Sequence, residues 1–467
     1  MPVSVAEEKA KAKEKEKVLN AICNDVIEQI RPGAKEQAEV KALTELIIAN
    51  LNSKAMEMGI DAHAISVGST ARNTWVSGEA DIDIFIMFPE ATSDQDLEAK
   101  GLALAKSVCD KYEERYASHP YIHAYFHFAD REYEVDLVPC FAVKDPSRLK
   151  SAVDRTPFHN EYVIQRLSGS GLEDEVRLLK QFLRCFGIYG SEQRRKGFSG
   201  YLCELLILKY QSFISFLKHA AEWRYGERID IEGHGKYRGD EPLIVIDPVD
   251  PKRNVAAAVS LYSFSRLIDA AREFLASPSH DFFRLKEPKP LSESEFRRIA
   301  KERGTAFVVL RFKAPEVVED ILFSQLRKAE ISVRRLIERN DFVVYRSGVT
   351  VDADTDTDEA IMVFELLVWQ LPAIKKHIGP PVTARRHAEK FKNKHSPPFL
   401  IEDGRYVVEV KRRYTDVVSL LKNELKSCSL GKHVSKAIEE GYEVSWIEET
   451  RFSTGIGLFF RDYFGYS

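Results

Sequence analysis

The chain has 467 residues, of which 44% are hydrophobic and 30% are charged, and its net charge is -4. A chain of this length exceeds one hydrophobic core, and its composition is that of ordinary globular domains. The slightly acidic charge excludes a general affinity for nucleic acid, so any RNA binding must use local basic patches. The six cysteines form no C-x-x-C pair, the N-terminus is too charged for a signal peptide, and no apolar run suits a membrane span. These features favour a cytoplasmic protein with reduced thiols.

Residues 1–150 predict a mixed head of strands and helices. Helices are expected over residues 4–58, with a break at Pro32-Gly33. A further helix is expected around residues 97–108. Four strands are expected at Ala64–Val67, Ile82–Phe88, Tyr121–Phe128 and Tyr133–Pro139.

The rest of the chain predicts three further parts. Residues 151–275 are mainly helical, and residues 276–372 have the β-α-β-β order of a ferredoxin-like unit. The expected elements of that unit are Thr305–Lys313, Pro315–Arg339, Phe342–Val351 and Ile361–Trp369. Residues 373–467 form a tail whose first part is basic. The sequence therefore predicts an α+β multidomain protein.

The most informative motif is Gly68-Ser69-Thr70-Ala71-Arg72, followed by Asp81-Ile82-Asp83. Glycine and serine at the start of a short helix offer backbone N–H groups to phosphate. Residues two apart in a strand share one face, so Asp81 and Asp83 should converge. Adjacent carboxylates repel unless cations neutralise them, and oxygen ligands beside a phosphate favour Mg²⁺. Asp136, alone in an apolar strand, is the candidate third carboxylate that two-metal nucleotidyl transfer requires.

These residues resemble the nucleotidyltransferase superfamily, which is built on a polymerase-β-type palm. Longer motifs narrow the resemblance to the archaeal-type, class I CCA-adding tRNA nucleotidyltransferases. They are Ser151–His159, Glu175–Lys180, Gly187–Gly190, Gly197–Glu204 and Asp247–Asn254. The strong matches span about residues 68–258, and weaker ones continue to the end. The resemblance implies a palm head, a helical neck, a ferredoxin-like body and a basic tail.

The resemblance also implies an activity: template-independent addition of C, C and A to the 3' end of tRNA from CTP and ATP, with release of pyrophosphate. Asp81, Asp83 and Asp136 would hold two Mg²⁺, one at the ribose 3'-hydroxyl and one at the triphosphate. Members of this family carry either Glu or Asp at the first of these three positions, which is Asp81 in this chain. The implied nucleotide contacts are Gly68, Ser69, Arg72, Thr156, His159, Lys180, Tyr189, Arg253 and Asn254.

Several of these side chains have a second interpretation. Arg177, Lys180 and Arg184 lie at i, i+3 and i+7, so they form either a phosphate-facing stripe or a solvated helix face. Arg253 either reads the Watson–Crick edge of the incoming base or pairs with a neighbouring aspartate, Asp247 or Asp250. A planar guanidinium fits both roles.

His123, His127 and His159 are candidates for metal ligands, nucleotide contacts or core positions. His159 is either a nucleotide contact or a satisfied core histidine. His123 and His127 lie four apart in an expected strand, which separates them by about 13 Å and excludes a shared metal ion.

The stretch Lys375–Arg413 holds eleven Lys or Arg and four Asp or Glu, a balance of +7 (11 minus 4), with aromatic residues between them. Composition alone fits either a surface that follows RNA phosphates or a solvated basic face. The resemblance favours RNA, since the family's tail grips the tRNA elbow while the head holds the 3' end. The candidate RNA contacts are Arg385, Arg386, Lys390, Lys392, Lys394, Lys411, Arg412 and Arg413.

Two other functions remain open from the sequence. A relative of poly(A) polymerases or oligoadenylate synthetases would use the same chemistry on another product. A non-catalytic RNA-binding protein would carry an inactive palm, although three intact carboxylates argue against it. The sequence leaves both a monomer and a homodimer open, and it does not show how CTP gives way to ATP.

Overall fold

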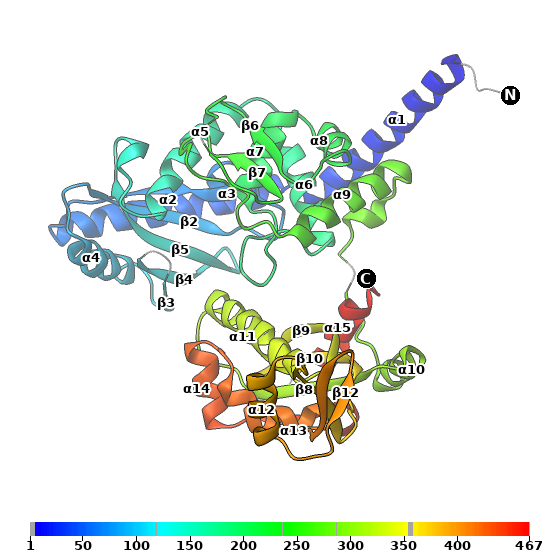
Figure 1. Ribbon diagram of the computed structural model, residues 1–467. Coiled ribbons are helices and arrows are strands. Elements are labelled where there is room, and N and C mark those ends of the chain that lie inside the picture. The colour runs from blue at the N-terminus through cyan, green and yellow to red at the C-terminus, as the bar shows by residue number, and fades with distance from the viewer. Residues whose placement is uncertain (1–4, 117–118, 236, 286, 354–357, 467) are drawn as a thin grey trace. The chain divides into compact units, whose positions relative to one another are not determined.

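The computed structural model describes residues 5–116, 119–235, 237–285, 287–353 and 358–466 (Figure 1). The chain forms two compact units, residues 1–286 and residues 287–467. The expected head and neck lie in the first unit, and the expected tail and all of the expected body after residue 286 lie in the second. The finer four-part division stays a prediction. In the described part of the chain, no helix is long and apolar enough to cross a membrane.

Two long helices begin the first unit, as the sequence predicted. Helix α1 (Val5–Ile30) and helix α2 (Ala34–Glu57) are separated at Pro32-Gly33, while Ser4, the first residue of the expected helix, lies outside the described residues. Proline removes a backbone donor and ends a helix. Helix α2 buries one apolar face, including Leu43 and Ile47, against the head sheet.

The head is a five-stranded sheet with the strand order β1-β2-β5-β4-β3. Its strands are β1 (His63–Val67), β2 (Ile82–Pro89), β3 (Tyr112–Tyr116), β4 (Pro120–Phe128) and β5 (Arg131–Ala142). Its short helices are α3 (Gly68–Ala71) and α4 (Asp94–Lys106). Strand β3 was not predicted, because it is an edge strand whose residues are mostly exposed and lack the apolar character of the other strands.

Strand alternation gives the head sheet two different faces. Ile84 and Leu137 are fully buried in the core that α2 and α4 share with the sheet. Their neighbours Asp83 and Asp136 point to the opposite face, because successive strand residues alternate. This second face therefore carries the carboxylates.

A mainly helical part completes the first unit and shares a separate core with α1. Its helices are η1 (Pro146–Arg148), η2 (Val153–Arg155), α5 (Thr156–Leu167), α6 (Glu173–Cys185), α7 (Gly200–Tyr210), α8 (Phe213–Ala220), α9 (Leu261–Ala276) and η3 (His280–Phe283). A parallel pair of short strands, β6 (Glu227–Asp230) and β7 (Leu243–Ile246), packs with them. Interlocked rings of Phe182, Phe213 and Phe274 lie at the centre of this core.

The second unit contains the predicted β-α-β-β order. Its elements are β8 (Ala306–Lys313), α11 (Glu319–Arg339), β9 (Val343–Asp352) and β10 (Glu359–Val368). The antiparallel sheet has the order β14-β8-β10-β9, so β14 (Glu443–Trp446), from the expected tail, completes the sheet of the expected body. Helices pack on both faces of this sheet. They are α10 (Glu293–Arg303), α13 (Val417–Glu424), η4 (Leu425–Ser427), α14 (Lys432–Glu440), η5 (Ile447–Glu449) and α15 (Thr454–Phe464).

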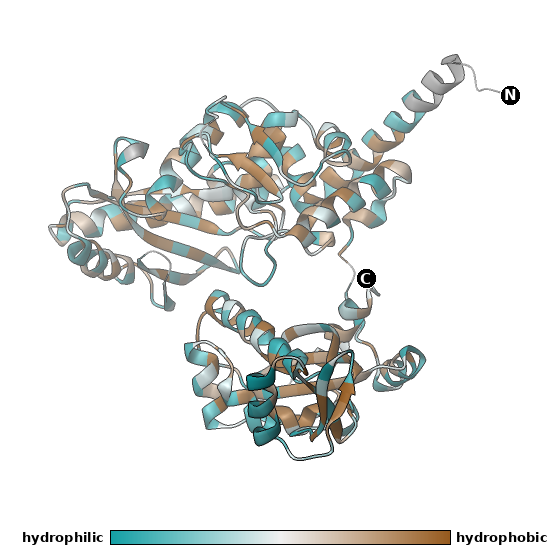
Figure 2. Cartoon of the chain, in the orientation of Figure 1, coloured by the Kyte–Doolittle hydropathy of each residue, from teal (hydrophilic) through white to brown (hydrophobic). Residues whose placement is uncertain are grey.

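A smaller sheet in the second unit carries the basic segment. Strands β11 (Ile374–Pro381), β13 (Arg405–Lys411) and β12 (Leu400–Glu402) lie side by side in that order. Helix α12 (Arg385–Lys394) is strongly hydrophilic in Figure 2 and packs on β11 through Phe391, which stacks on His377.

A buried carboxylate joins several elements of the second unit. Glu365 on β10 has no exposed surface, and its oxygens accept hydrogen bonds from Arg303, Thr305 and Tyr463 at 2.7–2.8 Å. Burial alone would raise the pKa of Glu365, but these three hydrogen bonds hold it below its ordinary value.

We expect Glu365→Ala to lower the free energy of unfolding of the second unit by about 2–3 kcal/mol, because three buried donors lose their acceptor. Since the pKa of Glu365 is depressed in the folded state, its stabilisation should be present at neutral pH and disappear as the pH falls below the ordinary carboxyl range. Urea unfolding at pH 7 and pH 3 measures both effects. Equal losses at the two pH values would contradict the role of the charge.

Candidate active site

One row of residues crosses the head sheet and places the candidate carboxylates together. In the observed register, Val67 on β1 faces Asp83 on β2, and Asp83 faces Asp136 on β5. Asp136 in turn faces His123 on β4. Adjacent strands lie about 4.8 Å apart, so the two carboxylates are neighbours on one face. Asp81 lies one residue before β2, close enough for its charge to act on Asp83, and its place on the same side stays a prediction.

The Gly68 turn lies directly against this row. Gly68 follows Val67 and has a φ of +79°, which favours glycine. A Cβ atom at Gly68 would come within 1.9 Å of the Asp83 Oδ2 atom. Only glycine therefore allows the backbone at the start of α3, with Ser69 next to it, to lie beside the Asp83 carboxylate.

The electrostatics of the row favour a bound cation. Burial, and then the charges of Asp136 and Asp81, raise the pKa of Asp83 to about 7, against an opposing effect of Arg72. Burial also raises the pKa of Asp81, together with the negative charges of Glu134 and Asp136. The local charge is therefore negative and poorly compensated by the protein.

The donor set fits magnesium that is shared with a substrate. Among the described residues, no three His, Cys, Asp or Glu side chains form a ready-made metal centre. Magnesium is commonly bound by one or two carboxylates together with waters and substrate phosphates, and not by a complete protein cage. Asp83 and Asp136, with Asp81 beside them, match that incomplete oxygen set.

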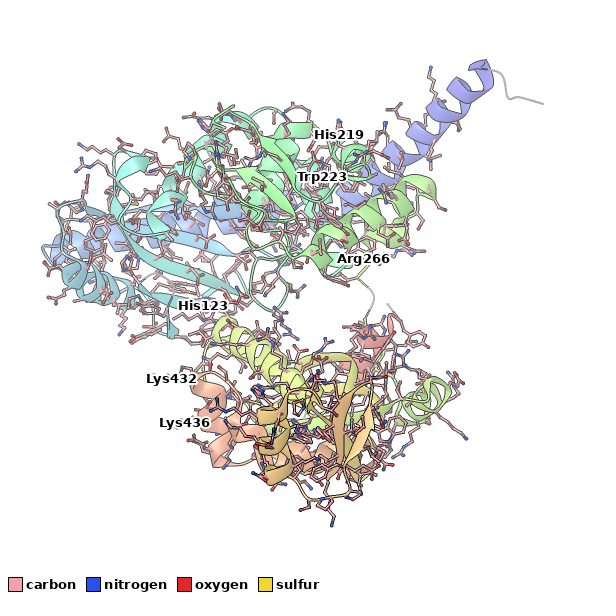
Figure 3. The ribbon with its side chains drawn as sticks, viewed as in Figure 1. His123, His219, Trp223, Arg266, Lys432 and Lys436 are labelled. Carbon is pink, nitrogen blue, oxygen red and sulfur yellow. The ribbon has the colours of Figure 1, made fainter. Side chains whose placement is uncertain are left out.

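His123 is a site residue whose role the sequence analysis missed (Figure 3). Its side chain is almost completely buried, and its Nδ1 atom lies 2.6 Å from Asp136 Oδ1. A carboxylate can only accept, so Nδ1 carries the proton. We therefore interpret His123 as the residue that orients Asp136. The sequence did predict the two strands that carry His123 and Asp136. It could not predict the register that places these two residues opposite each other.

A buried charged cluster holds Arg72. Glu204 on α7 has no exposed surface, and its Oε1 accepts from Arg72 Nε at 3.0 Å and from Thr74 Oγ1 at 2.6 Å. Lys180 on α6 donates to the Thr74 carbonyl at 2.9 Å. Burial, partly offset by Glu204, lowers the pKa of Lys180 to about 8. The cluster fastens the segment after the Gly68 turn to two neck helices.

Both interpretations of Arg177, Lys180 and Arg184 on α6, a stripe that faces phosphate and a solvated helix face, are wrong. Arg177 and Lys180 are 2% and 1% exposed, so they form neither a solvated face nor a stripe open to phosphate. Arg177 donates to the backbone carbonyls of Asn73 and Trp75. The physical reason is that this face of α6 packs on residues 73–75, whose carbonyls need donors once they are buried. Arg184, the third member, pairs with Glu79.

A second network surrounds Arg253 in the neck. Asp247, fully buried, accepts from His159 Nε2 and from Arg253 Nη1, each at 2.9 Å. Burial would raise the pKa of Asp247, but the hydrogen bond from His159, the Val249 backbone N–H and the Arg253 charge together lower it to about 2. Arg253 thus pairs with Asp247, one of the two expected partners.

The ring of His159 is fixed on two sides. It stacks on Tyr201 with 4.0 Å between ring centroids, and burial lowers its pKa despite the Asp247 contact. His159 is therefore a neutral donor at neutral pH.

Asn254 lies behind Arg253 with its amide occupied by backbone groups. Its Oδ1 accepts from the N–H groups of Val245 and Ala256, and its Nδ2 donates to the Leu243 carbonyl. These bonds shape the loop that carries Arg253, a role that the sequence analysis did not foresee.

The remaining predicted contacts lie on elements next to the row. Thr156 begins α5, two residues after Asp154, whose buried carboxylate accepts from the backbone N–H groups of Phe141 and Ser151. These bonds tie α5 to the end of β5. Tyr189 lies beside Lys180 across Gly200, where an added Cβ would come within 3.2 Å of the Tyr189 hydroxyl.

The predicted RNA contacts of the tail fall into two groups. Arg412 pairs with Asp341 and is mostly buried, and Arg413 pairs with Glu424 at 2.6 Å. Arg385 pairs only with Glu389 on its own helix and stays exposed. The other exposed members lie on α12 and at the end of β13. They are Arg386, Lys390, Lys392, Lys394 and Lys411.

We expect Asp83→Asn to raise the free energy of unfolding at pH 8 by about 1 kcal/mol or more, because it removes a buried charge that neighbouring carboxylates repel. The raised pKa means that folded Asp83 holds its proton up to about pH 7. The destabilisation caused by Asp83 therefore grows as the pH rises from the pKa of the unfolded chain to about 7. The gain should therefore be smaller at pH 5. Added Mg²⁺ should raise the Tm of the wild type more than that of the variant.

Asp61→Asn, at an exposed position, is the matched control and should be neutral at both pH values. A less stable Asp83→Asn protein at pH 8 would show that the carboxylate row is not under electrostatic strain. Thermal unfolding with and without Mg²⁺ provides all of these measurements.

Comparison with known proteins assigns the chain to a family. Three family models match in succession: the nucleotidyltransferase domain over residues 48–159, the second domain of tRNA nucleotidyltransferase over 174–284, and the C-terminal domain of the CCA-adding enzyme over 303–446. A solved cytoplasmic RNA terminal U-transferase aligns with 58% of this chain and 99% of its own at 15% identity and a TM-score of 0.44, which is too low to carry an argument.

Curated relatives match across nearly their whole length. A CCA-adding enzyme of Methanosarcina barkeri is 46% identical over 90% of this chain and 92% of its own. One from Methanosarcina mazei is 44% identical over the same shares. One from Haloarcula marismortui is 38% identical over 96% of this chain and 98% of its own. This chain therefore belongs to the CCA-adding enzymes, the tRNA nucleotidyltransferases.

Proposed function

We propose that this protein adds C, C and A to the 3' end of tRNA from CTP and ATP, with release of pyrophosphate. The observation that carries the proposal is the row of Asp83 and Asp136 on one face of the head sheet, with the Gly68 turn against it. Carboxylates that attract cations beside a phosphate-binding turn are the arrangement that nucleotidyl transfer needs.

Asp81, Asp83 and Asp136 would hold divalent cations, which we propose to be two Mg²⁺. When bound, such ions lower the pKa of an attacking hydroxyl and stabilise the charge on a leaving phosphate. The raised pKa of Asp83 supports this assignment, because the ionised form is disfavoured until a cation compensates it.

The protein's own residues position the reactants. His123 holds Asp136 through its Nδ1 proton, so the carboxylate presents its other oxygen to the ligand side. Glu204 holds Arg72 at the end of the Gly68 turn, where the guanidinium can meet a phosphate. Ser69, Thr156 and Tyr189 remain proposed nucleotide contacts around that turn, whereas Lys180 is buried against Thr74 and supports the turn from behind.

Arg253 is the proposed contact for the incoming base. Asp247 and the stacked His159–Tyr201 pair limit the freedom of its guanidinium, while 37% of the Arg253 side chain remains exposed. Asn254 supports this contact by holding the loop. A planar donor fork fixed in one orientation can distinguish the edges of C and A from those of U and G.

The exposed cations of α12 and β13 are the proposed surface for the tRNA elbow. Their lack of base-specific geometry suits recognition of RNA by shape and phosphate position. We also propose that the protein works in the cytoplasm, which its free cysteines support.

The test of the proposed function uses tRNA that ends at the discriminator base. CTP alone should extend it by two residues, and CTP with ATP by three, as measured by product length on a sequencing gel. Long homopolymer tails would indicate a poly(A) polymerase activity. No Mg²⁺-dependent extension would indicate a protein that binds RNA without catalysis.

We expect Asp136→Ala to reduce nucleotide incorporation by about 10³-fold or more, because a ligand of the reacting site is lost. The dissociation constant for tRNA should change less than about twofold, since Asp136 is not part of the RNA surface. Asp130→Asn, in the same β4–β5 hairpin, is the control, because its exposed residue has a φ of 64° that asparagine tolerates. If the Asp136→Ala enzyme incorporates nucleotide at a rate near that of the wild type, Asp136 is not a ligand of the reacting site.

We expect Arg253→Lys to raise the KM for both CTP and ATP by about tenfold and to increase misincorporation of UTP, because lysine keeps the charge but loses the planar fork. The neighbouring exposed residue provides the control Lys252→Ala. Steady-state kinetics with each nucleotide separates the two effects. If nucleotide selection is unchanged in Arg253→Lys, Arg253 does not contact the incoming base and its role is the ion pair with Asp247.

A further inference from the structure

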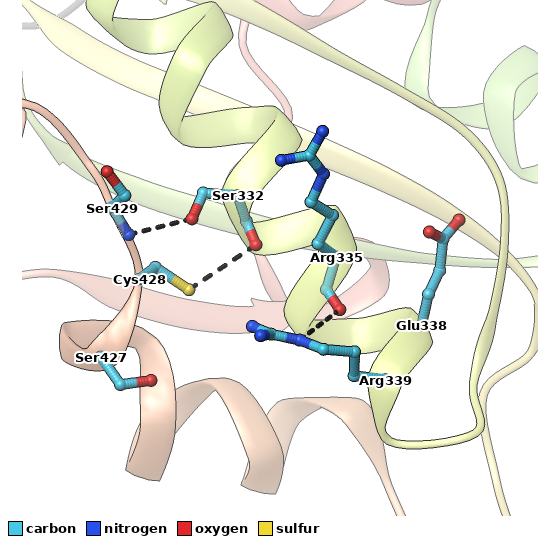
Figure 4. Close-up of a pocket in the computed structure, with 7 residues that line it drawn as sticks. All are labelled: Ser332, Arg335, Glu338, Arg339, Ser427, Cys428 and Ser429. Atoms are coloured by element: carbon cyan, nitrogen blue, oxygen red, sulfur yellow. Dashed lines mark hydrogen bonds between the residues drawn. The ribbon is translucent and has the colours of Figure 1, made fainter.

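A polar pocket of about 560 Å³ lies in the second unit between α11 and the segment Ser427–Ser429 (Figure 4). Arg335 and Arg339 line it from α11, together with Ser332 and Glu338. None of these residues belongs to the basic segment that the sequence analysis assigned to RNA.

The two arginines of the pocket carry uncompensated charge. Arg339 Nε donates to the Arg335 carbonyl at 3.1 Å, and among the described residues neither guanidinium has a carboxylate partner. The acid in the pocket, Glu338, pairs with Arg334 at 2.9 Å. In Figure 4, Arg339 extends toward Ser427–Ser429, whereas the Glu338 carboxylate points away from that segment.

The geometry of the pocket suits an anion. Like charges four residues apart on a helix repel each other, and an anion between them would relieve that repulsion. The opposite wall is held in place by α11, because Ser332 Oγ accepts from the Ser429 backbone N–H at 2.9 Å. Ser427, Cys428 and Ser429 line the pocket on this side.

We infer that this pocket binds a phosphate group, and that in the working protein the group is a backbone phosphodiester of the bound RNA. The choice of RNA as the source rests on the proposed function. Two guanidiniums with free N–H groups and neighbouring hydroxyls are the donors that phosphate oxygens accept from. The pocket lies on the α11 side of the second unit and adds a phosphate contact to those proposed on α12 and β13.

The test compares the wild-type protein with the double variant Arg335→Ala/Arg339→Ala. At about 0.15 M salt the variant should bind tRNA about tenfold more weakly. The magnitude of the slope of log K against log salt should fall by about one to two, because RNA binding releases fewer counterions when phosphate contacts are lost. The KM for CTP should not change. Arg298→Ala removes an exposed arginine of α10 that pairs with Glu302, and it serves as the control.

A second measurement identifies the source of the phosphate. Sodium phosphate, compared with sodium chloride at equal ionic strength, should raise the Tm of the full-length wild-type protein, and the double variant should lose this shift. A phosphate-dependent shift without any change in tRNA binding or salt slope would assign the pocket to free phosphate and overturn the RNA assignment. If neither measurement changes, the arginines only stabilise the end of α11 and the inference fails.

The proposed function is judged separately, by CCA addition with the wild-type protein. A wild type that extends tRNA correctly, with a double variant of unchanged salt slope, refutes the pocket and leaves the activity intact. A wild type that adds no nucleotide refutes the activity, while the phosphate-dependent Tm shift still tests the pocket.

Discussion

The parallel pairing of β2 with β5 is the constraint on which the first unit depends. It places Asp83 and Asp136 side by side on the face of the sheet that lacks the α2 and α4 core. Two adjacent, partly buried carboxylates destabilise the folded chain until a cation joins them. The head therefore contains an unfavourable interaction that a bound cation would relieve, as is common at sites that bind metal with substrate.

The neck compensates for this interaction by fixing the surrounding backbone. Arg177, Lys180 and Glu204 hold residues 72–75 with buried hydrogen bonds, so the segment after the Gly68 turn cannot move independently of α6 and α7. Burying such charges is unfavourable unless every donor finds an acceptor. The carbonyls of the head loop supply those acceptors, and the two parts of the first unit are thereby coupled.

Much of this arrangement was readable from the sequence. Apolar runs in Ile82–Phe88 and Tyr133–Pro139 predicted both strands, because a buried strand needs no tertiary information to be recognised. Pairings between distant segments were not readable. The contact of His123 with Asp136 depends on strand register, and the burial of Arg177 depends on which surface α6 covers. Spacing along one helix does not reveal what the helix packs against.

Two aspartates of the first unit show how environment gives identical side chains different roles. Asp247 receives donors from His159, Arg253 and the backbone, which lower its pKa to about 2, so its charge is already satisfied within the protein. Asp83 is buried beside Asp136 and Asp81, and burial together with these charges raises its pKa to about 7 against the opposing charge of Arg72. A satisfied carboxylate serves to position its donors, whereas an unsatisfied one attracts a ligand. Asp247 thus holds Arg253, whereas Asp83 has the electrostatic character of the cation ligand that we propose, without any difference in residue type.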